Sequence, residues 1–166
     1  LFQSGALINW MTVFDNVALP LRERTRMSEP EIEQSVNRAL GMVDLDGVQD
    51  KMPAELSGGM KKRAGLARAI IRDPELILYD EPTSGLDPVL SRSIDALILR
   101  LQKDLNATSV VVTHDLQSAL SVGDRIAMLH EGRIVCNLAP DEFRRSDDPV
   151  VEAFVEAQLG KVEQPK

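Results

Sequence analysis

Apolar residues recur every three to four positions in the first part of the chain, a period typical of helices with one buried face. The pattern predicts a first helix that begins after Thr12 and is limited or bent by Pro20. A second helix follows the capping-box sequence Ser-Glu-Pro-Glu at residues 28–31. A third helix begins at Ser57 and ends before the Asp-Pro pair at residues 73–74. These three helices precede the first complete strand.

From residue 75 onward, short apolar runs alternate with helical stretches. Strand, helix, strand is the order typical of a parallel sheet with crossover helices. The dipeptide at residues 131–132, Glu-Gly, predicts a tight hairpin, so the last two strands are expected to be antiparallel. A final helix is expected between Asp148 and Gly160. The other expected elements are strands at 75–80, 108–113, 124–130 and 133–138, and helices at 88–103 and 115–122.

The composition fits one soluble globular domain, with 166 residues of which 43% are hydrophobic. The formal net charge of −7 argues against a surface that coats nucleic acid or anionic lipid by bulk electrostatics. The apolar runs are far shorter than the roughly 20 residues that cross a bilayer. A single cysteine, Cys136, permits no internal disulfide and favours the cytoplasm.

Two adjacent carboxylates, Asp80 and Glu81, close the apolar run at residues 76–79. Burial of an unpartnered carboxylate is costly, so an acid pair at the tip of a buried strand implies a cation, a polarised water, or both. In phosphoryl transfer such an acid holds Mg²⁺, and a neighbouring carboxylate orients or deprotonates the attacking water. For an isolated Asp-Glu pair, an ordinary solvated strand end is the alternative interpretation.

Three further motifs point to the same chemistry. Ser57 with Gly58 and Gly59 opens a helix whose free N–H groups and positive dipole end suit a phosphate, although a flexible helix cap also explains them. His114 ends a strand, which places it at the same carboxyl edge of the sheet as the acid pair. Gln3 follows an apolar strand remnant. Taken alone, the histidine and the glutamine each also fit a surface role.

Five short motifs along the chain resemble those of the nucleotide-binding subunits of ABC transporters: in order, FQSG, LSGGM, DE, SGLD and TH. The resemblance covers the chain to about residue 140. The resemblance implies an α/β fold of the P-loop NTPase (ABC ATPase) class, incomplete, with a helical signature subdomain and the C-terminal part of a RecA-like parallel sheet core. It implies ATP and Mg²⁺ as cofactors. By resemblance, Gln3 is the Q-loop glutamine, and the signature motif comprises Ser57, Gly58, Gly59 and Met60. Asp80 is the Walker B aspartate and Glu81 is the catalytic glutamate. The D-loop comprises Ser84, Gly85, Leu86 and Asp87, and His114 is the switch histidine.

These likenesses assign the expected site. The catalytic residues are Glu81 and His114, the metal ligands are Asp80 and Gln3, and the ATP contacts are Gln3, Ser57, Gly58, Gly59, Met60 and Asp87. They also imply a division into the Q-loop and a core-strand remnant at 1–11, a helical subdomain at 12–72, the C-terminal part of the ATPase core at 73–145, and a C-terminal helix and tail at 146–166.

A narrower likeness concerns the substrate. The stretch LFQSGALINWMTVFDNVALPLRE, together with Met60 where most relatives have glutamine, resembles the ATPases of Mla/Mce-type phospholipid transport systems. This implies a lipid-transport ATPase that works as a head-to-tail homodimer, peripheral to the cytoplasmic face of the inner membrane. The implied partners are an integral-membrane permease, a periplasmic Mce-domain protein and a STAS-domain protein, with no nucleic acid. Contact with the permease is one interpretation of the apolar residues after the Q-loop, and plain packing is the other: Trp10, Met11, Val13 and Phe14.

Other functions share these motifs: an ABC importer of another class, such as the amino-acid type, a soluble ABC-type ATPase of DNA repair or translation, or a non-catalytic interaction domain. Only 54 positions separate Gln3 from Ser57, which leaves no room for a long coiled coil, and the acidic charge disfavours a nucleic-acid surface. Retention of Glu81 and His114 argues against lost activity. The chain contains no G-x-x-x-x-G-K-[ST] phosphate cradle, so we expect an N-terminal truncation and neither normal ATP affinity nor turnover from these 166 residues alone.

Overall fold

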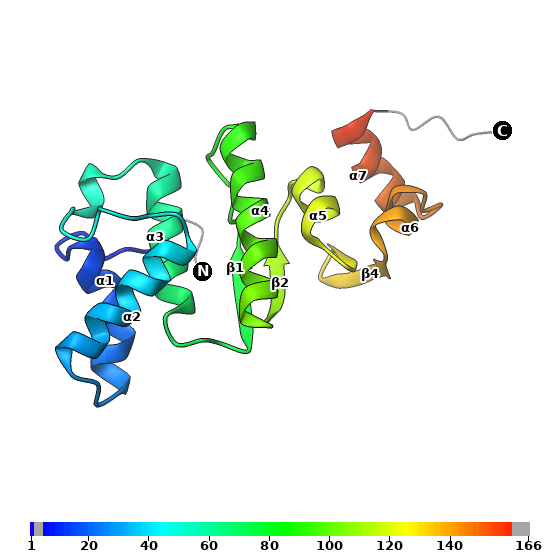
Figure 1. The fold of residues 1–166 in the computed structure, drawn as a ribbon. Coiled ribbons are helices and arrows are strands. Elements are labelled where there is room, and N and C mark those ends of the chain that lie inside the picture. Colours follow the sequence, from blue (N-terminus) through cyan, green and yellow to red (C-terminus); the bar gives the residue numbers. More distant parts are fainter. Residues whose placement is uncertain (2–4, 161–166) are drawn as a thin grey trace. The chain divides into compact units, whose positions relative to one another are not determined.

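The computed structural model describes residue 1 and residues 5–160, and the chain divides into two compact units, residues 1–112 and 113–166. The first unit joins a group of helices to a two-stranded sheet, and the second contains a hairpin with short helices (Figure 1). Each unit has its own cluster of buried apolar side chains.

Three helices of the first unit pack against one another: α1 (Val13–Arg24), α2 (Glu29–Met42) and α3 (Gly58–Ile70). Their predicted starts are confirmed. The Asp15 N–H donates to Thr12 Oγ1 at 3.0 Å, and the Ser28 N–H donates to Glu31 Oε2 at 2.7 Å, the reciprocal bond of a capping box. A 3₁₀ turn, η1 (Pro53–Glu55), precedes α3 and was not predicted.

Of the two effects expected of Pro20, a limit to the first helix is wrong, because α1 continues to Arg24, and a bend stays a prediction. Proline removes one backbone hydrogen bond from a helix interior. Val17 and Leu21 on either side of Pro20 are buried in the core, and this packing holds the turn in helical form.

The sheet of the first unit is parallel, as predicted. Strands β1 (Leu76–Asp80) and β2 (Thr108–Val112) pair in register, with α4 (Pro88–Leu105) as the connection between them. Along β1, Ile77 and Tyr79 are buried in one core with the apolar side of α4, while the alternate positions of both strands are exposed. One face of this sheet is therefore covered and the other is open.

The second unit contains α5 (Leu116–Val122), the strands β3 (Ile126–His130) and β4 (Arg133–Leu138), then α6 (Pro140–Arg144) and α7 (Pro149–Leu159). The predicted antiparallel hairpin is confirmed, with a register irregularity between Met128 and Leu129. The short α6 was not predicted, although its sequence has Pro140 in the first turn and Glu142 reaching back to the Ala139 N–H at 3.0 Å.

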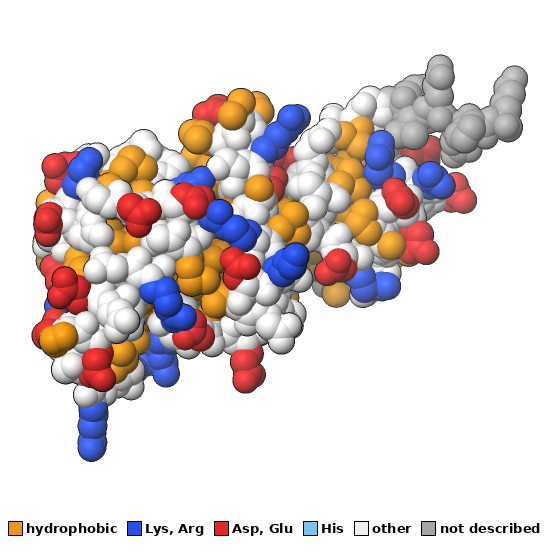
Figure 2. Space-filling model, viewed as in Figure 1, with side chains coloured by type: hydrophobic (Ala, Val, Ile, Leu, Met, Phe, Trp, Pro, Cys, Tyr) orange, Lys and Arg blue, Asp and Glu red, His pale blue; other side chains and the backbone are white. Residues whose placement is uncertain are grey.

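None of the helices within the described residues is both long and apolar enough to traverse a bilayer. On the face shown in Figure 2, acidic and basic side chains are interspersed, with apolar patches between them, rather than gathered by sign.

Candidate functional site

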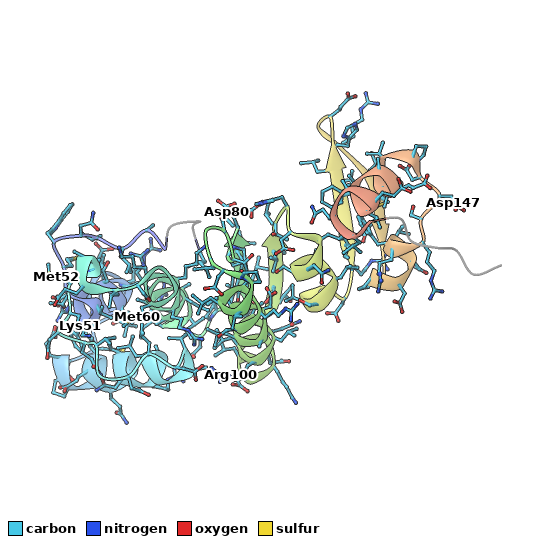
Figure 3. The ribbon with its side chains drawn as sticks, turned by 90° about the horizontal axis from the view of Figure 1, so that it is seen from above. Lys51, Met52, Met60, Asp80, Arg100 and Asp147 are labelled. Atoms are coloured by element: carbon cyan, nitrogen blue, oxygen red, sulfur yellow. The ribbon has the colours of Figure 1, made fainter. Side chains whose placement is uncertain are left out.

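The predicted acid pair lies at the carboxyl end of β1. Asp80 is the last strand residue, is exposed, and pairs in register with Val112 of β2; Figure 3 labels it at the strand tip. Glu81 turns out of the strand with φ of 46°, in the left-handed region that residues other than glycine rarely adopt, and is half-buried. Its N–H donates to the Val112 carbonyl at 2.9 Å. The two carboxylates therefore leave a parallel sheet at the edge where ligands of α/β proteins bind.

The signature segment (residues 56–60) forms the start of α3. Ser57 caps the helix, since its Oγ accepts the Met60 N–H at 3.3 Å, and both Ser57 and Gly58 are exposed. A Cβ added at Gly58 or Gly59 would meet its nearest side-chain atom at 3.7 or 3.9 Å, which is ordinary contact. The fold of this chain does not itself require glycine here, whereas a ligand that approaches the backbone N–H groups of the first helical turn would.

The D-loop segment (residues 84–87) lies beside the signature segment. The side chains of Leu86 and Leu90 are the nearest neighbours of the Cβ positions at Gly58 and Gly59. Asp87 caps α4, with its Oδ1 accepting the N–H groups of Val89 and Leu90 at 2.9 and 3.0 Å. The structure therefore brings two of the predicted motifs together within the first unit.

A residue that sequence reasoning missed, Lys62, connects α3 to the acid pair. Its Nζ donates to the Glu81 carbonyl oxygen at 3.1 Å, and its side chain is only 7% exposed. Burial lowers the pKa of Lys62, and the nearby charge of Glu81 opposes that shift. The sequence could have indicated the burial of Lys62, because its helical spacing places it on the same face of α3 as Gly59, Leu66 and Ile70, which are buried.

A second connection from α3 passes through Arg63. Its Nη1 donates to the Val43 carbonyl at 2.6 Å and to Asp44 Oδ2 at 3.0 Å, and its Nη2 donates to Ser93 Oγ on α4 at 2.6 Å. Arg100, labelled in Figure 3, donates to the same Asp44 Oδ2 at 2.8 Å. The bond from Arg100 and then that from Arg63 lower the pKa of Asp44. Hydrogen bonds at Asp44 and Arg63 thus connect three helices: the end of α2, the middle of α3, and α4.

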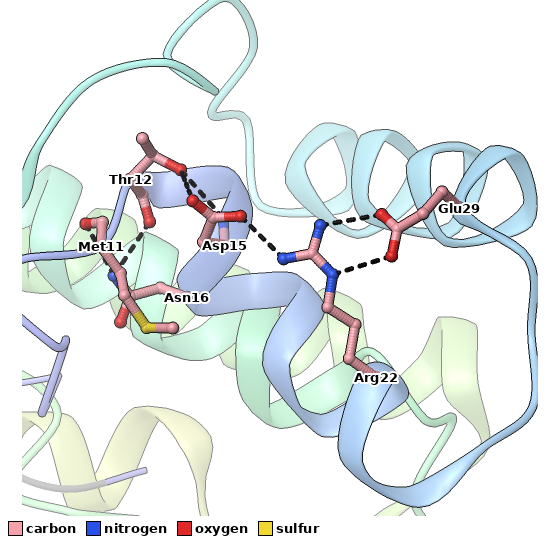
Figure 4. Close-up of polar contacts among 6 residues, drawn as sticks. All are labelled: Met11, Thr12, Asp15, Asn16, Arg22 and Glu29. Carbon is pink, nitrogen blue, oxygen red and sulfur yellow. Dashed lines mark hydrogen bonds and ion pairs between the residues drawn. The ribbon is translucent and has the colours of Figure 1, made fainter.

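The loop before α1 is held by a buried asparagine (Figure 4). Asn16 Nδ2 donates to the carbonyls of Ile8, Met11 and Thr12 at 2.9–3.1 Å, and its Oδ1 accepts the Ile8 N–H at 2.7 Å. Trp10 lies in this loop and is 82% exposed, whereas Val13 is fully buried. The packing interpretation therefore holds for Val13, and Trp10 is available to a partner.

Two other predicted site residues are described apart from this group. His114 is exposed and belongs to the second unit, where Gln158 Nε2 donates to its backbone carbonyl at 2.6 Å. The convergence of His114 with the acid pair stays a prediction. Gln3 lies outside the described residues.

The described residues contain no group of three or more His, Cys, Asp or Glu side chains placed to hold a metal ion. Asp80 fits Mg²⁺ in another way, because this cation is commonly bound by one or two carboxylates with the remaining positions taken by phosphate oxygens and water. An exposed oxygen ligand at the tip of β1 suits that arrangement.

Comparison with known proteins decides the family. The family described as ABC transporter matches residues 1–84, half of the chain. The chain belongs to the ABC transporter family. Among relatives in this family, the probable ribonucleotide transport ATP-binding protein mkl of Mycobacterium bovis is 45% identical over 155 residues, 93% of this chain and 43% of the relative. The intermembrane phospholipid transport system ATP-binding protein MlaF of Escherichia coli is 44% identical over 156 residues, 94% of this chain and 58% of MlaF.

Solved structures of ABC proteins confirm the expected fold. The ATP-binding cassette MJ0796, solved as a dimer bound to ADP and Pi, matches with a TM-score of 0.74 and 35% identity over 84% of this chain and 61% of that one. The cbiO1 protein of Clostridium perfringens, part of the cbiONQ transporter complex, matches with a TM-score of 0.80 and 29% identity over 95% of this chain and 62% of that one. This chain thus spans about half the length of the curated relatives mkl and MlaF. The predicted resemblance to ABC transporter subunits, including those of phospholipid transport, is confirmed at the level of sequence similarity.

Proposed function

We propose that this chain acts within an ABC ATPase subunit that hydrolyses ATP to drive transport of phospholipid across the cell envelope. The observation that carries the proposal is the start of α3, where Ser57 and Gly58 are exposed and the fold itself requires neither glycine, so the N–H groups of the first helical turn suit a phosphate. This helix start lies against the D-loop segment, and α3 reaches the acid pair through Lys62. Phosphoryl transfer needs both kinds of group, a phosphate-binding backbone and a carboxylate that positions the attacking water.

The roles proposed for Glu81 and Asp80 follow from their place at the strand end, and those of the other residues rest on the motif resemblance. Glu81 orients the attacking water and accepts its proton, because it is the carboxylate that turns out of the strand end. Asp80 would hold Mg²⁺, which when bound neutralises the charge that develops on the phosphate oxygens. Ser57, Gly58 and Gly59 present N–H groups and a hydroxyl to the γ-phosphate bound by a second, head-to-tail subunit. By the motif resemblance, Gln3 and His114 sense the γ-phosphate and the metal, and Met60 and Asp87 contact ATP.

The subdomain division proposed from the sequence accompanies these roles. The helical subdomain at residues 12–72 carries the signature segment, and the core at 73–145 carries the acid pair and His114. The segment at 1–11 carries the Q-loop, and the residues after 145 form the C-terminal helix and tail.

The identity to MlaF supports phospholipid as the substrate. The mkl protein, at 45% identity, carries a name that refers to ribonucleotide transport, so ribonucleotide is the second candidate substrate. For the transporter that contains this subunit, purified in detergent and supplied with saturating ATP, we expect turnover to rise when phospholipid is added and not to rise when a ribonucleoside monophosphate is added. Stimulation by ribonucleotide alone would contradict the lipid assignment.

We propose the same set of partners that the resemblance implied: a second copy of the subunit, an integral-membrane permease, a periplasmic Mce-domain protein and a STAS-domain protein, at the cytoplasmic face of the inner membrane. Trp10 is the candidate contact to the permease, because it is exposed on a loop that Asn16 fixes. Trp10→Ala should weaken co-purification with a permease, whereas Asn9→Ala, at the neighbouring exposed position, should not. Equal recovery from both variants would contradict the contact at Trp10.

The hydrolytic role is tested by Glu81→Gln in a full-length cassette that contains this chain. Loss of the proton acceptor should lower ATP turnover by about 100-fold or more while ATP binding is retained. Glu75→Gln, the same substitution at the exposed position before β1, is the control and should turn over ATP normally. Unchanged turnover in Glu81→Gln would overturn the proposal. The 166 residues alone, which lack the G-x-x-x-x-G-K-[ST] cradle, are expected to show neither normal ATP affinity nor turnover.

A further inference from the structure

Lys62 is a charged side chain in an apolar position. It lies on the buried stripe of α3 and is 7% exposed, whereas lysine is almost never fully buried unless it is paired. The desolvation of an ammonium group is costly unless hydrogen bonds replace those of water. Its Nζ makes such a bond to the Glu81 carbonyl oxygen at 3.1 Å, across 19 positions of sequence.

The backbone of Glu81 is held by three different parts of the first unit. Its N–H donates to the Val112 carbonyl at the end of β2, at 2.9 Å. Its carbonyl accepts from Lys62 Nζ of α3, and also from the N–H of Ser84 in the D-loop segment at 3.2 Å. One peptide carbonyl therefore joins the signature helix to the D-loop turn.

The conformation at this residue is an unfavourable one. With φ of 46°, Glu81 occupies the left-handed region, which is unfavourable for a residue that lacks the local hydrogen bonding of Asn or Asp. Such a conformation persists only when surrounding contacts determine it. The hydrogen bonds at the carbonyl and the N–H of Glu81 supply these contacts. They fix the backbone dihedral angles of Glu81. Those angles set the direction of the Cα–Cβ bond, from which the carboxylate extends.

We propose that Lys62 is a positioning residue for Glu81: its ammonium group holds the left-handed backbone of Glu81, so that the signature helix and the carboxylate form one rigid unit. The carboxylate direction then depends on where α3 lies. Any displacement of α3, for example when a phosphate binds at its start, is transmitted to Glu81 and to the Ser84 turn. The structural part of this inference stands on the chain alone, and its catalytic consequence rests on the proposed function.

The structural part is tested in the 166-residue chain by hydrogen exchange of the Ser84 and Glu81 amides. Lys62→Met keeps the length of the aliphatic side chain and removes the donor, so both amides should exchange roughly 10- to 100-fold faster, the effect of losing one charged hydrogen bond. Lys61→Met, the same change at the preceding, half-buried position of α3, should leave both rates unchanged. Lys62→Arg retains a cationic donor and should keep most of the protection.

Circular dichroism shows which variants fold. If Lys62→Met does not fold, Lys62→Arg carries the test, and rapid exchange at Ser84 in a folded Lys62→Arg chain contradicts the inference. Exchange of Ser84 and Glu81 at the native rate in folded Lys62→Met overturns it outright.

The catalytic consequence is tested in an ATP-hydrolysing cassette that contains this chain. Lys62→Met should lower kcat roughly 10- to 100-fold, as misplacement of a catalytic group does, with KM for ATP unchanged and with recovery in Lys62→Arg. Lys61→Met should leave kcat and KM at their native values. A raised KM with native kcat would overturn the positioning role and leave the proposed function intact. Unchanged turnover in Glu81→Gln would instead contradict the proposed function, whatever the exchange rates at Ser84 show.

Discussion

At the scale of single residues, the ionisation of Tyr79 depends on its burial in the core next to the acid pair. It is the only tyrosine of the chain and lies one position before Asp80, 1% exposed. Burial raises the pKa of Tyr79 to about 12, and the neighbouring Ser109 hydroxyl opposes part of this shift. The phenol therefore stays neutral in the folded state at pH values where it ionises in the unfolded chain.

Tyr79 is expected to make the protein sensitive to alkali. Because its folded pKa lies above the unfolded value of about 10, its contribution to stability is complete below about pH 10 and is lost as the pH rises through about 12. The loss should amount to about 2–3 kcal/mol. Urea unfolding across this pH range should show the decrease in the free energy of unfolding of the native chain. In Tyr79→Phe, the part of the decrease that comes from ionisation of Tyr79 should be absent.

Ultraviolet absorbance of tyrosinate supplies a direct check, since a single tyrosine gives the whole signal. The titration midpoint should move from about 12 in the folded chain to about 10 in urea. A folded midpoint near 10 would show that the hydroxyl reaches water.

At the scale of elements, α3 depends on a close backbone contact. A Cβ added at Gly65 would lie 2.7 Å from the Gly5 carbonyl oxygen and 2.9 Å from the Gly5 Cα, closer than real Cβ atoms approach. Arg68 Nη2, one turn further along α3, donates to the same Gly5 carbonyl at 3.0 Å. The segment at Gly5 thus crosses α3 at a distance that only a glycine on the helix permits.

Gly65→Ala should therefore destabilise the first unit, although alanine is the better helix former. Overpacking against backbone atoms costs about 1–3 kcal/mol, which outweighs the roughly 1 kcal/mol of helix propensity gained. Gly41→Ala, in α2, is the matched control, because its Cβ would meet only Asp46 Oδ1 at 3.6 Å. Chemical denaturation followed by circular dichroism should show a lower midpoint for Gly65→Ala and an equal or higher midpoint for Gly41→Ala. A stabilised Gly65→Ala would mean that the segment at Gly5 does not lie against α3.

At the scale of the whole molecule, one face of the parallel sheet is exposed and apolar. Its exposed fractions are 52% for Leu76, 58% for Leu78, 47% for Val110 and 59% for Val112. Leu78 and Val110 are directly paired in the register. Parallel sheets occur almost only with both faces covered, and contiguous apolar patches mark contact surfaces.

The 166-residue chain is therefore expected to self-associate through this face. The double variant Leu78→Lys and Val110→Lys should remain monomeric to concentrations at which the native chain associates, because two desolvated ammonium groups would oppose the contact. Leu99→Lys, at an exposed apolar position of α4, should associate as the native chain does. Sedimentation velocity over a concentration series distinguishes these outcomes, and equal association of all three chains would contradict a role for the sheet face.

Much of the fold and part of the candidate site were predictable because their signals are local. Caps such as Thr12, Ser28 and Ser57 act within four residues, and the apolar period reflects one helix or one strand at a time. The position of Asp80 at a strand end follows from the same local pattern. Local rules failed at Pro20, where burial of α1 in the core outweighed a lost hydrogen bond.

The sequence by itself determined where the helices and strands begin and which chemical groups stand at their ends, since these depend on neighbours a few residues apart. Only the tertiary structure decided that Lys62 donates to the backbone carbonyl of Glu81, that the segment at Gly5 lies against Gly65, and that Leu86 and Leu90 lie beside the glycines of the signature segment. These contacts join residues far apart in the chain, and no local period specifies which buried side chain meets which carbonyl. Tertiary packing determines these contacts. A buried ammonium group is stable only where a hydrogen-bond acceptor lies within reach, and a close backbone approach is stable only where no side chain intervenes.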